Sequence, residues 1–197
     1  IERDIRLAEL TGAHYHIAHI STRDAVDVIR KAKKKGLNIT CDTAPPYFLL
    51  NETSLLTYDT SYKLSPPLRA NEDRLAIIEG IQDGTIDAIA SDHRARSKDT
   101  KAQPFSAASI GAAGIETLFV LTLELVHKKI INLSQAISLI TINPTKILKI
   151  KEPALLENET ATFIIFDKNY SHEININELK TSPTPFNGRQ VKGKILG

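Results

Sequence analysis

The hydrophobic residues of this chain follow two kinds of spacing, which alternate from residue 1 to about residue 150. Val26, Ile29 and Ala32 recur at helical spacing before Gly36, and predict a helix with one buried face. Short apolar runs between turn-forming residues are typical of buried strands. The chain has three of them, at His14–Ile20, Leu37–Thr43 and Ile86–Ala90. Strands that alternate with helices favour a parallel sheet, so we expect an α/β fold.

Helix boundary signals extend this pattern. Ser21 with Asp24 has the spacing of a capping box, and Asn71 is predicted to cap a helix over Glu72–Gln82. A helix that ends at Gly12 opens the chain. Three more are predicted, at Ile115–His127, at Ser134–Thr141 and from Asn143 onward. Two long stretches are predicted to be irregular, at Ala44–Arg69 and at His93–Gly111.

The pattern changes after Ile150. Residues Ala161–Asp167 and Arg189–Gly197 are predicted to be strands without helices between them. The segment Glu173–Asn177 could form another strand. We therefore expect residues 1–150 to form the α/β body and residues 151–197 to form a small β element packed against it.

Composition excludes several classes of protein. A net charge of +2 is too small to indicate binding to nucleic acid or to an anionic membrane, and neither is expected as a partner; no apolar run reaches the roughly 20 residues that span a bilayer. The single cysteine, Cys41, excludes an internal disulfide and favours a reducing, cytoplasmic location. Because the chain has no methionine, we expect it to be the C-terminal part of a longer protein.

Two polar side chains end predicted strands, where α/β proteins place their active sites. His19 ends the first strand and Asp92 the third. Imidazole nitrogen and carboxylate oxygen both suit zinc, so the two residues could share a metal ion. Two alternatives stay open at this point. Each residue could simply hydrogen-bond a neighbouring loop, or His19 and Asp92 could form a hydrolase triad with Ser21.

Three segments carry a resemblance to a known family. "HYHIAHISTRDAVDVIRKAKKKG", "YDTSYKLSPPLRANEDRLAIIEGIQDGTIDAIASDH" and "GIETLFVLTLELV" together resemble the C-terminal half of bacterial dihydroorotases, in particular those of alphaproteobacteria. The resemblance covers essentially the whole chain. It implies the C-terminal part of an amidohydrolase (β/α)8 TIM barrel, with the three predicted strands as barrel strands six to eight, and part of a small β domain.

The resemblance also implies a reaction and roles for named residues. The reaction would be the reversible, zinc-dependent cyclisation of N-carbamoyl-aspartate to dihydroorotate in de novo pyrimidine biosynthesis. His19, in "HIST", would bind zinc, and Asp92, in "SDH", would be both metal ligand and general acid/base. The backbone amide of Gly111 would contact substrate.

Two departures from the family pattern affect the substrate contacts. Many relatives have asparagine where this chain has Ser65, and many have histidine where it has Arg96. That histidine binds the substrate's carboxylate, and an arginine fork could take over the role. Arg96 could equally be a loop residue paired with a carboxylate. Where relatives read "PHH", this chain has Pro45-Pro46-Tyr47.

The remaining ligands of the family would lie upstream, so this chain alone is expected to be inactive. Two competing functions stay open: an inactive dihydroorotase-like scaffold for aspartate transcarbamoylase, and another cyclic amidase of the allantoinase or hydantoinase type. A small-molecule substrate is implied, and a homodimer or a complex with the transcarbamoylase is possible.

Overall fold

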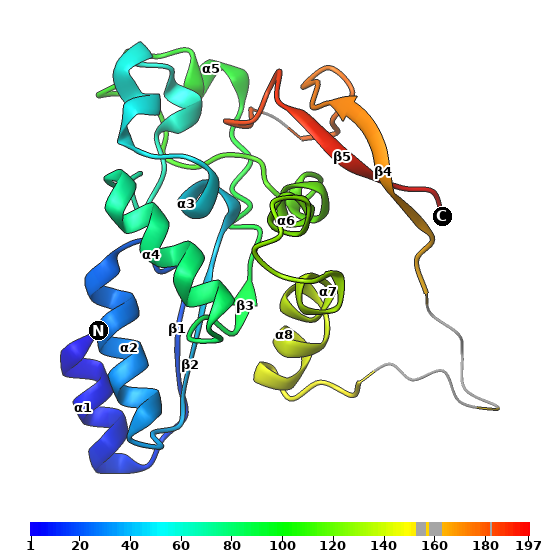
Figure 1. Cartoon of the computed structure of the whole chain (residues 1–197). Coiled ribbons are helices and arrows are strands. Elements are labelled where there is room, and N and C mark those ends of the chain that lie inside the picture. Colours follow the sequence, from blue (N-terminus) through cyan, green and yellow to red (C-terminus); the bar gives the residue numbers. More distant parts are fainter. Residues whose placement is uncertain (153–156, 158–162, 182) are drawn as a thin grey trace.

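A computed structural model describes residues 1–152, 157, 163–181 and 183–197 of the chain (Figure 1). The strands are β1 (Tyr15–Ile17), β2 (Ile39–Thr43), β3 (Ala88–Ile89), β4 (Phe166–Glu173) and β5 (Gln190–Ile195). The helices are α1 (Glu2–Thr11), α2 (Arg23–Lys34), α3 (Pro45–Leu49), α4 (Asn71–Gln82), α5 (Lys98–Lys101), α6 (Leu118–His127), α7 (Leu133–Ile140) and α8 (Ile142–Ile147). Two 3₁₀ turns, η1 (Glu52–Thr57) and η2 (Thr60–Tyr62), lie between α3 and α4.

The first three strands form one parallel sheet in the order β1-β2-β3, as predicted. Each strand is shorter than the sequence suggested. The segments that follow β1 and β3 nevertheless remain hydrogen-bonded to β2. The Ile20 N–H donates to Asp42 O at 2.9 Å, and the Ala90 N–H donates to Thr43 O at 2.8 Å. The carboxyl ends of the three strands therefore stay close together.

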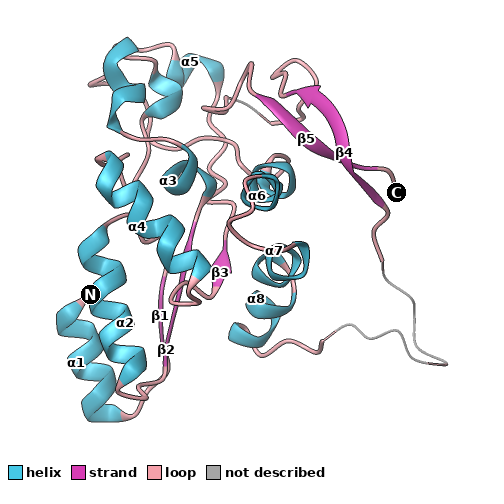
Figure 2. Cartoon of the chain, viewed as in Figure 1, coloured by secondary structure: helices cyan, strands magenta, loops and turns pink. Residues whose placement is uncertain are grey.

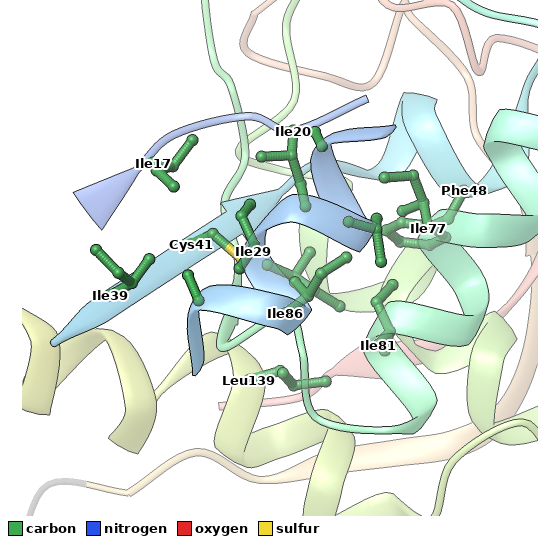
Figure 3. Close-up of a cluster of buried hydrophobic side chains, with 14 of the residues drawn as sticks. Ile17, Ile20, Ile29, Ile39, Cys41, Phe48, Ile77, Ile81, Ile86 and Leu139 are labelled. Carbon is green, nitrogen blue, oxygen red and sulfur yellow. The ribbon is translucent and has the colours of Figure 1, made fainter. Parts of the chain in front are cut away.

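The helices α1, α2 and α4 lie on one side of the sheet, and α6, α7 and α8 follow on the side of β3 (Figure 1). A cluster of apolar side chains fills the space between strands and helices (Figure 3). Ile29, Cys41, Ile77 and Ile86 are at most 1% exposed there. Burial raises the pKa of the Cys41 thiol to about 12, which keeps it protonated as a core residue.

Three predicted helix starts were wrong. The cap of α2 is Thr22, whose hydroxyl accepts the Ala25 N–H, while Ser21 is buried. Asn71 is the first residue of α4 rather than its cap, because its side chain bonds Arg74 instead of a backbone N–H. The third, α6, begins at Leu118 rather than Ile115, since the preceding backbone is held by a loop contact described below.

The last two strands form an antiparallel hairpin that lies beyond α6 (Figure 2). The predicted strand Arg189–Gly197 is confirmed as β5. The predicted strand Ala161–Asp167 was misplaced: Ala161 and Thr162 lie outside the described residues, and β4 begins only at Phe166. Most of β4 is polar and exposed, so its sequence lacks the apolar run that marks a strand. Of the segment Glu173–Asn177, only Glu173 belongs to β4.

Arg189 anchors the hairpin to α6. Its Nε and Nη2 atoms donate to the two carboxylate oxygens of Glu124 at 2.6 and 2.9 Å.

The division of the chain at residue 150 stays a prediction. Among the described helices, none combines the length and the apolar character needed to cross a membrane.

Candidate active site

His19 and Asp92 follow β1 and β3 at the carboxyl edge of the sheet. The Nε2 atom of His19 lies 3.7 Å from Oδ1 of Asp92. Both residues have a left-handed backbone, with φ of 55° and 43°, which few residues other than glycine adopt. The structure therefore brings together the two residues that the sequence singled out, and it turns the chain sharply at each of them.

This pair fits one side of a metal site. Zinc binds imidazole nitrogen and carboxylate oxygen at about 2.0–2.2 Å, so two neighbouring ligands of one tetrahedral ion lie about 3.4 Å apart. The observed 3.7 Å between His19 Nε2 and Asp92 Oδ1 is close to that separation. Within the described residues, no group of three or more histidine, cysteine or carboxylate side chains is placed to hold an ion. The pair supplies two ligands, and a tight site needs more.

Asp42, on the central strand β2, holds His19 from the side opposite Asp92. Its Oδ1 accepts the His19 backbone N–H at 2.7 Å and faces His19 Nδ1 at 2.9 Å. Its Oδ2 faces His16 Nε2 at 2.9 Å. Burial opposes ionisation of Asp42, but the hydrogen bonds from His19 and His16 outweigh it and hold the pKa of Asp42 below its usual range. The bond to Asp42 in turn raises the pKa of His19.

Tyr47 contacts the other oxygen of Asp92. It belongs to α3, which the sequence analysis treated as part of an irregular stretch. Its hydroxyl lies 3.3 Å from Asp92 Oδ2 and 3.0 Å from the Pro66 carbonyl oxygen. Burial raises the pKa of Tyr47, so the phenol stays protonated and its single O–H is shared between these two acceptors. The sequence did contain a signal for this contact, because Tyr47 is an aromatic residue that follows closely after the end of a predicted strand. The sequence analysis noted it only as a departure from the family pattern.

Close backbone packing fixes the loop that follows Asp92. His93 Nδ1 accepts the backbone N–H groups of Gly114 and Ile115, each at 3.3 Å, so this segment cannot start α6. A side chain at Gly114 would place its Cβ 2.3 Å from the Ser91 carbonyl oxygen. Only glycine therefore fits at position 114 without displacing the residue that precedes Asp92.

Two lysines hold the loops above the sheet: Lys63 links the stretch after β2 to the stretch after β3, and Lys101 ties the second stretch to itself. Lys63 Nζ donates to the carbonyl oxygens of Phe105 and Ser106 at 2.7 and 2.8 Å. The buried Lys101 Nζ donates to the carbonyl oxygens of Ser109 and Gly111 at 3.0 and 2.9 Å. The two stretches that were predicted to be irregular thus form one connected cap on the carboxyl edge.

The three expected substrate-binding residues lie in this cap, and their roles stay predictions. Ser65 is exposed and precedes a cis Ser65–Pro66 bond. Arg96 is exposed, and its Nε donates to the Ile110 carbonyl oxygen at 2.8 Å. The Gly111 N–H donates to the Lys63 carbonyl oxygen at 2.9 Å. The arginine that contacts Asp92 is Arg94, whose Nε lies 3.8 Å from Oδ1.

The triad alternative does not fit this geometry. Ser21 is only 6% exposed, so its hydroxyl is not presented to a substrate. The two ring nitrogens of His19 already face Asp42 and Asp92. A serine nucleophile would need one of those nitrogens as its base.

Comparison with known proteins now identifies the family. The amidohydrolase family profile matches residues 2–197. The chain belongs to the amidohydrolase family. A protein of Anaplasma phagocytophilum named dihydroorotase is 42% identical over 199 aligned residues, which cover 100% of this chain and 44% of that protein. The chain thus spans less than half the length of this curated relative.

Solved structures of amidohydrolases share the fold. The L-hydantoinase of Arthrobacter aurescens superposes with a TM-score of 0.91 at 23% identity, over 98% of this chain and 45% of that one. The inactive dihydroorotase-like domain of a Chaetomium thermophilum CAD-like multifunctional protein gives 0.71 at 19% identity, over 98% of this chain and 51% of the other. The expected architecture, the C-terminal part of an amidohydrolase barrel, is confirmed.

Proposed function

We propose that this chain is the C-terminal part of a dihydroorotase, which hydrolyses the ring amide of dihydroorotate and, in reverse, cyclises N-carbamoyl-aspartate in pyrimidine biosynthesis. The observation that carries the proposal is the 3.7 Å approach of His19 and Asp92. It occurs in a chain that aligns over its whole length with proteins named dihydroorotase. A small-molecule substrate and a location in the cytoplasm follow from this proposal.

His19 Nε2 and Asp92 Oδ1 would hold the metal, for which we propose zinc. When bound, zinc supplies a water that is acidic enough to react near neutral pH, and it polarises the amide carbonyl. The Asp92 carboxylate would take the proton of the attacking water as the new C–O bond forms. It would return that proton to the ring nitrogen as the C–N bond breaks. Tyr47, which donates to the second oxygen of Asp92, would keep the carboxylate in this orientation.

The substrate is acidic, so its carboxylate needs a cationic or strongly polar partner. We propose Arg96 for this role, and Ser65 and Gly111 as further contacts to the substrate. The Arg96 guanidinium is anchored through Nε, which leaves its terminal nitrogens for a bidentate contact. The Gly111 N–H is bonded to Lys63 O, so its contact with substrate would require that bond to open. Ser65 lies exposed in the cap.

The test is turnover of dihydroorotate by the whole protein, with and without a chelator. We expect chelation to stop the reaction, added zinc to restore it, and Asp92→Ala to lower kcat by at least about a thousandfold, because the variant lacks both a ligand and the proton carrier. Asp99→Ala, an exposed carboxylate in the loop after Asp92, is the matched control and should leave turnover unchanged. Full activity of Asp92→Ala would contradict the proposal.

The same assay separates the competing functions. A cyclic amidase of the hydantoinase type would hydrolyse hydantoin faster than dihydroorotate. A scaffold protein would hydrolyse neither, with any metal supplied. We do not favour the scaffold, because His19 and Asp92 are both retained and converge.

A further inference from the structure

We propose that Asp42 is a positioning residue that fixes both the backbone and the ring of His19, so that the Nε2 lone pair of His19 faces Asp92. This inference rests on the proposed metal-dependent function, and it assigns a role to a carboxylate that contacts neither substrate nor metal. His16 and Thr40 extend the same arrangement by orienting Asp42.

The first step of the argument is the donor count at Asp42. The Asp42 carboxylate faces one backbone N–H and two imidazole nitrogens, and a carboxylate has no N–H of its own to donate, so it acts here as the acceptor. Its Oδ1 accepts the His19 backbone N–H at 2.7 Å and lies 2.9 Å from His19 Nδ1. Nδ1 must therefore carry a proton. In the neutral ring Nε2 is then the bare nitrogen, which is the form that binds a metal.

The second step is the backbone of His19, which has φ of 55°. A histidine adopts this conformation only where its surroundings hold it there. Asp42 contributes two contacts to that end. Its carboxylate accepts the His19 N–H, and its own carbonyl oxygen accepts the N–H of Ile20 at 2.9 Å. One residue on the central strand thus fixes both the turn after β1 and the ring that the turn presents.

The third step is what holds Asp42. Asp42 Oδ2 lies 2.9 Å from His16 Nε2, and His16 Nδ1 lies 2.9 Å from Thr40 Oγ1. Thr40 Oγ1 is also 2.9 Å from His14 Nε2. One consistent set of donors satisfies the whole chain: His14 donates to Thr40, Thr40 to His16, and His16 to Asp42. The row of polar side chains along β1 and β2 therefore ends at the candidate metal ligand.

The test is zinc affinity of the whole protein, measured by competition with a chromogenic chelator. We expect Asp42→Asn to weaken zinc binding by about 10- to 100-fold, the usual effect of removing a partner that orients a metal-binding histidine. The matched control is Asp87→Asn. Asp87 is also a structural carboxylate that accepts a backbone N–H of β2, from Cys41, but it does not contact His19. Its loss should lower stability and leave zinc affinity unchanged.

A second readout needs neither metal nor turnover. Nitrogen NMR of the His19 ring at alkaline pH should show the proton on Nδ1 in the wild-type protein, and a growing share of the Nε2–H form in Asp42→Asn. A wild-type ring protonated on Nε2 overturns the inference without any variant. So does an Asp42→Asn protein that keeps both the wild-type tautomer and the wild-type zinc affinity. If the wild type binds no zinc, the proposed function fails, and the tautomer measurement alone decides the role of Asp42.

Discussion

At the scale of single residues, the candidate site combines side chains that the sequence could identify with others that it could not. His19 and Asp92 follow apolar runs, so their place at strand ends was readable from the pattern. Asp42 and Tyr47 were not, because their roles depend on contacts with residues 23 and 45 positions away along the chain. Tyr47 had been noted only for its position after two prolines.

Arg96 provides a prediction at this scale. Arg96→Ala should raise KM for dihydroorotate by about tenfold or more and change kcat far less, because a charge-assisted contact with the substrate's carboxylate is worth about 1.5–3 kcal/mol. Steady-state kinetics of the whole protein measure both constants. Lys98→Ala removes an exposed cation from the same loop and should leave KM unaltered. An unchanged KM for Arg96→Ala would reduce Arg96 to a loop residue that bonds Ile110.

At the scale of elements, periodicity predicted the body of the chain well and its end poorly. Helices α2 and α4 bury apolar residues, and strands β2 and β3 are short buried runs, so both kinds of element leave a readable pattern. The strand β4 has mostly exposed polar residues and pairs with β5 through a register shift. The position of β4 depends on its pairing with β5 and not on its own sequence. The prediction was therefore placed too early, on the apolar run just before β4.

The ion pair between Glu124 of α6 and Arg189, the residue before β5, makes the free energy of unfolding depend on pH. Burial opposes ionisation of Glu124, but the hydrogen bonds from Arg189 outweigh it and hold the pKa of Glu124 below its usual value in the folded protein. A lowered pKa means that this contribution to stability is complete above the unfolded-state value, about pH 4.3, and is lost as the pH falls through the folded-state value. The pair therefore stabilises the protein at neutral and higher pH and stops doing so only in acid, as Glu124 becomes protonated.

Glu124→Gln tests this contact. We expect the variant to lose about 2 kcal/mol of unfolding free energy at neutral pH, and the difference from wild type to shrink as the pH is lowered toward about pH 3. Urea unfolding across this pH range measures it. Lys128→Gln is the matched control, because Lys128 also pairs with Glu124 but is 53% exposed, so its loss should cost less than about 0.5 kcal/mol. A constant difference at all pH values would count against the assignment.

At the scale of the whole molecule, one apolar cluster connects helices α2 and α4 with helices α6 and α7 and with the sheet. Ile29 of α2 is 0% exposed within it (Figure 3). Ile29→Ala should lower the free energy of unfolding by about 2–5 kcal/mol, since the cavity lies among fully buried neighbours. Chemical denaturation measures the loss. Leu10→Ala, at a leucine that is 83% exposed, should change stability by no more than about 0.5 kcal/mol.

The parallel α/β sheet was accessible from the pattern of the sequence, and the barrel architecture from the family resemblance. The arrangement of the cap was not. Lys63 and Lys101 look like ordinary surface cations in the sequence, yet each bonds two backbone carbonyl groups of the loop after β3. The contacts of Lys63 depend on where two long loops meet in space, and those of Lys101 depend on how its own loop folds back, so no local spacing encodes either.

The left-handed backbone at His19 and Asp92 has a consequence for how this protein changes over generations. Such a conformation costs a residue with a side chain about 1 kcal/mol or more, and glycine avoids that cost. Replacing Asp92 with glycine would remove that backbone strain together with the contact to Tyr47, so the two effects on stability would oppose each other. In a lineage released from selection for catalysis, loss of the reaction would then cost the fold little, so inactive members of the family should arise repeatedly and remain well folded.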